Sequence, residues 1–366
     1  MRVENVIYIY MYMCISLVIF DVFYMIIKSR DNKKIISNKK IFYYPIKEEI
    51  LKLKNGEKAS EKHKKYLLKK LKNVKYLLEF NNALSEIENE DIDYVYKYLY
   101  EIHVVFIELA IHYRKRPDME RAYFAYLISK HGFCKIMTES PLINTMFFIL
   151  NEKSVYCREN AMKAIYSFGD EALVIDALKI IDENQRFLHK KLLTDGLLSF
   201  NGDHIRLSNA LWNSFDNFSN NIKISIVDYF RFSKKDFKCE LLPYMKDENT
   251  FIELKYSIIR YYGSMYYKEA KYYLIDIIKN DKNNWEIVAI ATTSIALYKD
   301  KDTIDILKSM LCNKNWYVRL NAANSLVKMG ISNDDISEIL NGDDKYAKEI
   351  LSYCLGISKN KKRKEG

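Results

Sequence analysis

A recurring segment dominates this chain and restricts what it can fold into. A basic residue recurs at intervals of 31 to 37 residues along the last two thirds of the chain. The positions in this register are Arg121, Arg158, Lys190, Lys223, Lys255, Val288 and Arg319, with valine in the sixth place. A period of this length is typical of chains that stack small helical units on one another.

The register can be tested on positions that were not used to define it. Three residues later every copy is apolar: Phe124, Ala161, Leu193, Ile226, Ile258, Ala291 and Ala322. Seven residues later every copy is apolar again: Ile128, Ile165, Leu197, Phe230, Tyr262, Ile295 and Leu326. Five residues later stands a polar or amphipathic ladder: Tyr126, Lys163, Asp195, Asp228, Arg260, Thr293 and Asn324. Two apolar positions four residues apart, with a polar one between them, predict a helix with one buried stripe.

Each period also holds an earlier apolar helix, such as residues 302–311, followed by a turn rich in Asn and Asp. Two helices per period, stacked in sequence, make an α-solenoid. With only 4 prolines and 10 glycines in 366 residues, a β-sandwich or barrel would lack turn residues. The predicted fold is therefore all-α, with about seven helical pairs over residues 118–356 and a helical N-terminal cap over residues 76–117.

One unit carries the pattern V-R-x-x-A-x-x-x-L-x-x-x-G, formed by Val318, Arg319, Ala322, Leu326 and Gly330. Residues 158–169 and 121–132 repeat it with other apolar side chains. The pattern resembles HEAT repeats of the short bacterial, armadillo-like kind. The resemblance implies a solenoid that binds other proteins, and a structural role for its arginines between stacked helices.

The N-terminus predicts a membrane anchor. The 22 residues from Val6 to Ile27 contain no Lys or Arg and one charged residue, Asp21, and they are long enough as a helix to cross a bilayer. A cleaved signal peptide and a buried core helix are the alternatives. Six cations follow within thirteen residues, so the positive-inside rule places the C-terminal body in the cytoplasm of a single-pass cell-membrane protein.

The charge is distributed unevenly. Residues 28–75, a predicted basic juxtamembrane neck, carry a net charge of +12, and the tail, placed at residues 357–366, adds +4. The neck could bind anionic lipid through an amphipathic helix, or it could be a solvated linker. Residues 76–358 have a net charge of −5, so nucleic acid is not expected as a partner.

The sequence shows no phosphate-binding loop, no metal-ligand motif and no nucleophile motif. We therefore expect no enzymatic activity, no cofactor and no metal. The predicted function is a membrane-anchored cytoplasmic scaffold that binds a protein partner, and resembling proteins assist envelope or glycosyltransferase systems. The alternatives are a nucleic-acid-binding or DNA-glycosylase-like HEAT protein and a HEAT-type lyase or assembly factor. The predicted binding residues are Lys163, Asp195, Asp228, Arg260, Tyr126, Tyr229 and Tyr261.

Overall fold

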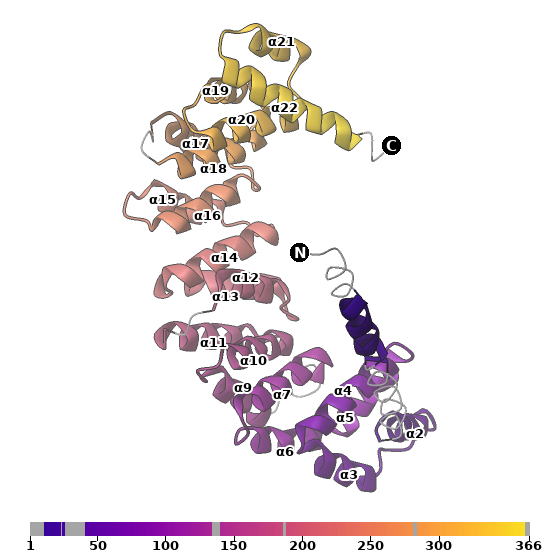
Figure 1. The fold of residues 1–366 in the computed structure, drawn as a ribbon. Coiled ribbons are helices and arrows are strands. Elements are labelled where there is room, and N and C mark those ends of the chain that lie inside the picture. The colour runs from indigo at the N-terminus through magenta and orange to yellow at the C-terminus, as the bar shows by residue number, and fades with distance from the viewer. Residues whose placement is uncertain are drawn as a thin grey trace. The chain divides into compact units, whose positions relative to one another are not determined.

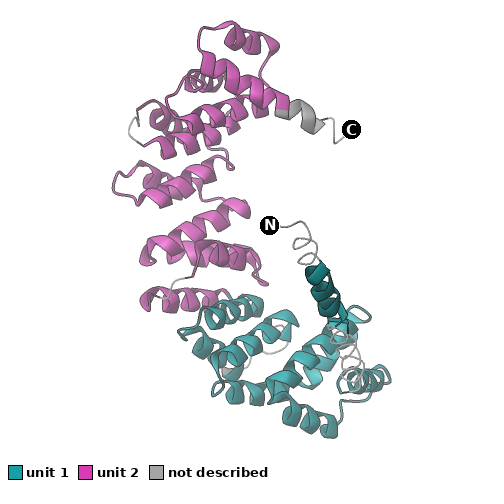
Figure 2. Ribbon diagram, viewed as in Figure 1, with its two compact units in different colours: residues 1–170 teal, residues 171–366 magenta. Residues whose placement is uncertain are grey.

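The structure is a computed structural model that describes residues 11–22, 24–25, 41–133, 140–185, 188–280 and 284–362. Within these residues all regular secondary structure is helical and there is no strand, which confirms the predicted all-α class. The chain divides into two compact units, residues 1–170 and residues 171–366 (Figure 2).

In the first part of unit 1 the helices pack against partners three helices further along the chain. Contacts join α2 to α5, α3 to α6 and α4 to α7, and further contacts join α6 to α9 and α7 to α10. The bounds are α2 Tyr43–Lys54, α3 Glu61–Leu71, α4 Val74–Glu88, α5 Ile92–Glu101, α6 His103–Tyr113, α7 Asp118–Lys130, α9 Ser140–Leu150 and α10 Val155–Phe168. From α2 to α7 the stacking period is thus three helices, which sequence reasoning did not predict.

In unit 2 the stacking partner is two helices further along (Figure 1). Contacts join α12 to α14, α14 to α16, α16 to α18, α18 to α20 and α20 to α22. The bounds are α11 Glu171–Glu183, α12 Lys190–Leu198, α13 His204–Asn213, α14 Asn220–Phe232, α15 Lys238–Lys246, α16 Ile252–Tyr262, α17 Lys268–Asn280, α18 Trp285–Ser294, α19 Lys301–Met310, α20 Trp316–Met329, α21 Asn333–Asn341 and α22 Lys345–Lys362. Two 3₁₀ turns, η1 Phe215–Asn217 and η2 Ile295–Leu297, extend the helices before them.

The predicted register is confirmed by the helices that it defines. Its seven copies coincide with α7, α10, α12, α14, α16, α18 and α20, which we call the second helices. All fourteen side chains at the third and seventh positions after the basic residue are buried, with at most 1% of their surface exposed. The alternation of apolar and polar positions therefore set the inward face of every second helix.

The repeated arginines tie each second helix to the turn before it. Arg319 Nη1 donates hydrogen bonds to the carbonyl oxygens of Asn313 and Lys314, at 2.8 and 3.0 Å. Arg158 does the same in its own unit, with carbonyl acceptors at 3.1 and 2.7 Å in the turn that precedes α10. These bonds satisfy carbonyl groups that the end of the preceding helix leaves without a partner. The structural role expected for these arginines is supported by this geometry.

The second half of the predicted basic neck belongs to the folded body. Its apolar residues Ile50, Leu67 and Leu71 are buried, because α2 and α3 pack on α4, α5 and α6. They point into the protein and are not available to a lipid surface. The prediction of a separate neck over residues 28–75 is therefore wrong from residue 41 onward, and residues 28–40 lie outside the described part.

Lysines of this segment are also paired within unit 1. Lys47 Nζ lies 2.5 Å from a carboxylate oxygen of Glu90, and Lys54 Nζ lies 2.5 Å from one of Asp91. Both acids stand in the turn between α4 and α5. Part of the local positive charge is thus balanced by acidic residues at the surface of the same unit.

The predicted anchor is only partly covered by the structure. Residues 11–22 and 24–25 are helical and exposed, whereas the first residues of the predicted span and its last two lie outside the described residues. Among the residues that the structure describes, no helix combines the length and the apolar character that crossing a membrane requires.

Candidate functional site

The predicted polar ladder lies on the outward face of the second helices. Lys163, Asp195 and Arg260 are exposed, and Tyr126 and Asp228 are partly exposed. Tyr126 and Lys163 belong to unit 1, and the other three belong to unit 2. Within unit 2, α12, α14 and α16 are stacked neighbours, so Asp195, Asp228 and Arg260 stand on successive helices.

Asp228 is less free than the other members of the ladder. Its side chain is 19% exposed, and one carboxylate oxygen lies 3.1 Å from Nη2 of Arg231, one turn further along α14. Burial raises the pKa of the Asp228 carboxyl above its ordinary value, although the guanidinium groups of Arg231 and Arg260 act in the opposite direction. Reversing the charge of Asp228 would place a cation beside the guanidinium groups of Arg231 and Arg260. Asp228 is therefore not a surface position whose charge can be reversed without disturbing its neighbours.

The predicted tyrosines Tyr229 and Tyr261 are fully buried, and their assignment to an exposed binding surface is wrong. The Tyr229 hydroxyl lies 2.9 Å from Nδ1 of His204. The Tyr261 hydroxyl donates to the Lys235 carbonyl at 2.7 Å and accepts from the Phe237 amide at 2.8 Å. An amphipathic tyrosine fits a core position when its hydroxyl reaches a polar partner, and here Tyr261 holds the turn before α15.

A second exposed feature, which sequence reasoning missed, is an aromatic edge at the start of the last second helices. It consists of Ile252, Trp285, Trp316 and Tyr317, which are 39%, 43%, 49% and 54% exposed. The rings of Trp285 and Tyr317 stack at 5.3 Å across α18 and α20, and Trp316 meets Tyr317 edge-on at 5.1 Å. The signal was present in the sequence, because Ile252, Trp285 and Trp316 all stand three residues before the repeated basic position.

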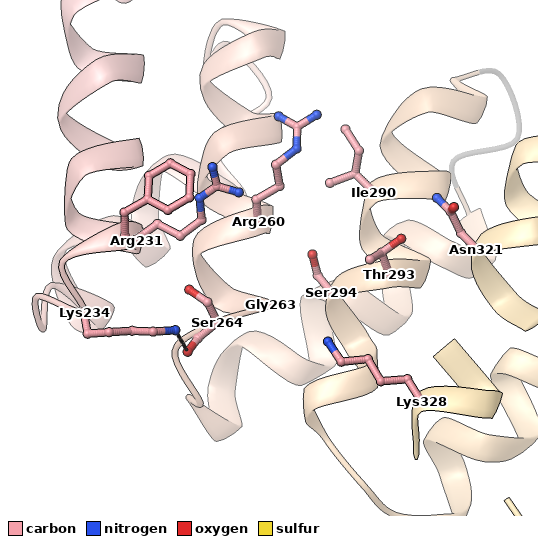
Figure 3. A pocket seen from close by; sticks show the side chains of 11 residues that line it. Arg231, Lys234, Arg260, Gly263, Ser264, Ile290, Thr293, Ser294, Asn321 and Lys328 are labelled. Carbon is pink, nitrogen blue, oxygen red and sulfur yellow. Dashed lines mark hydrogen bonds between the residues drawn. The ribbon is translucent and has the colours of Figure 1, made fainter. Parts of the chain in front are cut away.

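At the other end of the same helices lies a pocket of about 600 Å³ (Figure 3). It is formed by the end of α14 and the turn after it, by α16, by α18 and by α20. We call it the basic pocket, because its lining includes four cations, Arg231, Lys234, Arg260 and Lys328, but no carboxylate. Of the predicted binding residues, only Arg260 lines it.

The four cations differ in how they are held. Arg231 pairs with Asp228, and Lys234 Nζ donates to the Ser264 carbonyl at 3.1 Å. Lys234 has a φ of 54°, in the left-handed region, so a tight turn directs its side chain. Arg260 and Lys328 make no hydrogen bond or ion pair to any residue that the structure describes.

Two like charges share one side of this pocket. Burial lowers the pKa of the Arg260 guanidinium, and Asp228 acts against this effect while Arg231 adds to it. Figure 3 shows the guanidinium groups of Arg231 and Arg260 beside one another. Asp228 is the nearby carboxylate that offsets part of this repulsion.

The floor of the pocket depends on Gly263. A Cβ at this position would lie 2.9 Å from the Cα of Ser294 and 2.7 Å from its hydroxyl oxygen. The absence of a side chain therefore lets the end of α16 approach α18 closely. Over the residues that the structure describes, no three His, Cys, Asp or Glu side chains are placed to hold a metal ion.

Residues 273–349 match the family model for HEAT repeats. This segment runs from within α17 into α22 and includes most of the aromatic edge and the Lys328 side of the basic pocket. It covers less than a quarter of the chain. The search of curated proteins gave no match. HEAT repeats generally mediate protein–protein interactions, so the chain is similar, over these helices, to repeats that bind proteins.

Proposed function

We propose that this chain is a non-catalytic scaffold that binds a protein partner through the second-helix face of unit 2. The observation that carries the proposal is the aromatic edge. Trp285, Trp316 and Tyr317 expose large rings, and Tyr317 stacks on Trp285 and meets Trp316 edge-on. Trp and Tyr are the residues that most often dominate protein interfaces, because they bury much surface with few rotatable bonds.

The charges on the same helices support a selective surface. Asp195 and Arg260 are exposed and of opposite sign, and they stand two stacked helices apart on α12 and α16. Charges at the border of an interface affect partner choice and association rate more than affinity. The aromatic edge would then supply the affinity and the polar ladder the selectivity.

The test is partner capture by chemical cross-linking in the source cell, with the full chain carrying Trp285→Ala and Trp316→Ala together. The control is Tyr272→Ala, which removes a ring that is 62% exposed on α17, a first helix of its pair. We expect the double variant to lose specific cross-linked partners and the control to keep them, with both melting as the unchanged chain does. Retention of every partner by the double variant contradicts the proposal.

We further propose that the scaffold works at the cell membrane, with its body in the cytoplasm. This part rests on the sequence alone, namely on the run from Val6 to Ile27, which contains no Lys or Arg and one charged residue, Asp21, and on the cations that follow it. The resemblance to membrane-linked HEAT proteins suggests a partner from an envelope or glycosyltransferase system. Alkaline carbonate extraction tests the placement, because an integral protein stays in the membrane pellet and a peripheral one is released.

A further inference from the structure

We propose that the basic pocket binds an acidic segment of the partner, that is, a stretch of peptide with clustered negative charge. The inference deepens the proposed function and rests on it, since it names the chemistry of the partner at one place on the surface. The shared chemistry is a pair of neighbouring negative charges, supplied by carboxylates or by a phosphoester.

The charge of the pocket favours such a ligand. Four cations line it, and Asp228 offsets one of them, which leaves three positive charges around one hollow. Arg260 and Lys328 are the two whose side chains make no hydrogen bond or ion pair to the described residues, and both belong to stacked helices that hold them in place. Bringing like charges together is unfavourable until an anion enters.

Hydrogen-bond donors stand beside these cations. Nε of Arg231 is buried and makes no hydrogen bond to the described residues. The hydroxyl of Ser294 lines the pocket, and so does the amide of Asn321, one N–H of which already donates to the Ala289 carbonyl at 2.9 Å. Figure 3 shows the Lys328 ammonium on the Ser294 side. Guanidinium, ammonium, hydroxyl and amide donors around one space are the set that binds oxyanions.

A peptide fits the surroundings better than a free anion. The pocket volume of about 600 Å³ is large for one inorganic ion and suits several side chains. Along α18, Thr293 at the pocket is eight residues from Trp285 at the aromatic edge, which is about 12 Å of helix. An extended peptide covers that length with about four residues. One short segment can therefore place acidic groups in the pocket and an apolar side chain on the edge.

Nucleic acid is the less favoured polyanion. A nucleic-acid surface needs a basic stripe that follows many phosphates. Here residues 76–358 carry a net charge of −5, and Glu253 and Glu286 stand at the N-terminal ends of α16 and α18, beside the aromatic edge. The four cations of the basic pocket form one local cluster.

The experiment measures fluorescence polarisation of labelled peptides with the full chain, purified in mild detergent. One peptide carries a run of glutamates, a second has glutamine in their place, and a third carries phosphoserines. The variant Arg260→Gln with Lys328→Gln removes the two unpaired cations. The matched control is Lys279→Gln, which removes an exposed cation from α17, outside the pocket.

We expect the glutamate and phosphoserine peptides to bind and the glutamine peptide to bind at least about tenfold more weakly. The double variant should lose about tenfold or more for the charged peptides, and Lys279→Gln should change nothing. Asp228→Asn should act in the opposite direction and tighten binding by about threefold, because it removes the opposing carboxylate. Binding should also weaken as salt is raised.

Several results would overturn the inference. The charged and glutamine peptides could bind equally, or the affinity could be unchanged in the double variant. The inference is also wrong if inorganic phosphate competes as strongly as the peptides bind, or if a single-stranded oligonucleotide binds the pocket more tightly than either charged peptide. The scaffold surface and the acidic-peptide pocket can be disproved independently. If the Trp285→Ala, Trp316→Ala variant loses partners while peptide affinity does not depend on the charge of the pocket, only the pocket inference is wrong. If peptide binding follows the pocket charge while the aromatic variant keeps every partner, the proposed surface is wrong.

Discussion

Several buried side chains in these units are held by the hydrogen bonds that their polar atoms make. Tyr229 and Tyr261 bury their rings and use their hydroxyls to hold a histidine ring and a turn. In unit 1, His63 is likewise buried, with Nε2 2.7 Å from the Tyr98 hydroxyl and the carboxylate of Glu49 nearby. These three buried side chains are therefore bonded in small local groups, and titratable members of such groups titrate differently in the folded and unfolded chain.

His63 should make stability depend on pH. Burial lowers the pKa of its ring below the ordinary value of 6.5, an effect that Lys52 reinforces and Glu49 and Glu48 oppose. As pH falls through 6.5 the unfolded chain therefore takes up a proton before the folded chain does, and stability is lost. Thermal unfolding from about pH 7.5 to about pH 5.5 should show a shallower fall for His63→Gln than for the unchanged chain. An equal or steeper fall in the variant contradicts this account.

Gly263 should be intolerant of even one extra carbon. In Gly263→Ala the new Cβ would lie 2.9 Å from the Cα of Ser294, so α16 and α18 would have to move apart. We expect a loss of about 1–3 kcal/mol in denaturant unfolding. The control is Gly356→Ala in α22, where a Cβ meets nothing within 4 Å and a helical alanine should stabilise by about 0.5–1 kcal/mol. Equal effects at the two glycines would show that the close approach does not matter.

The helices stack in two ways in this molecule. Unit 2 follows the predicted pairs, each second helix packing on the next. In unit 1, the helices α2, α3 and α4 stack on the third helix further along, namely α5, α6 and α7. Both arrangements use the same second-helix pattern, since Phe124 and Ala161 are as fully buried as Ile226 and Ala322. The apolar positions of the register set which face of a second helix points inward. The number of helices between one second helix and the next sets the stacking period.

The register is tested by a pair of substitutions on α20. Ala322 is fully buried at the third position, and Asn324, two residues later, is exposed at the fifth. Ala322→Phe should overpack the contact with α18 and cost about 1–3 kcal/mol in urea unfolding. Asn324→Phe adds a larger ring to solvent and should stay within about 0.5 kcal/mol. Similar costs at the two positions would contradict the register.

At the scale of the whole molecule, the boundary of the folded body lies earlier than the sequence suggested. Phe42, Ile46 and Ile50 of the segment around α2 are buried against unit 1, together with Leu67 and Leu71 of α3. The body therefore includes α2 and α3 in addition to the predicted cap. This is also why an isolated body over residues 76–358, which the sequence suggested, would expose part of its own core.

Two truncated chains test this boundary. A chain that begins at residue 41 keeps α2 and α3, and it should be soluble and unfold in one cooperative transition for unit 1. A chain that begins at residue 76 leaves the α4 and α6 partners of Leu67 and Leu71 uncovered, and it should aggregate or melt at lower temperature. Circular dichroism melting and size-exclusion chromatography give the comparison. Equal stability of the two chains would mean that α2 and α3 are dispensable.

The sequence by itself determined the all-helical class, the seven second helices and the side chains on their inward faces. Helical periodicity is local, so residues three and four apart declare a common face before any tertiary contact forms. The sequence also indicated a structural role for Arg158 and Arg319, because they stand at the same position of their repeats. The aromatic edge was equally readable, since Ile252, Trp285 and Trp316 share one register position.

Only the tertiary structure decided where the ambiguous amphipathic residues go. The apolar face of α3 could meet lipid or protein, and the packing of α4 and α6 resolved this in favour of protein. Tyr229 and Tyr261 suit an interface or a core, and the nearby polar partners placed them in the core. The basic pocket joins Arg231, Lys234, Arg260 and Lys328 from different positions of three repeats, so no periodicity could reveal it. Such a site depends on the distances between packed helices, and these distances are set by side-chain volumes and close approaches such as that of Gly263 to Ser294.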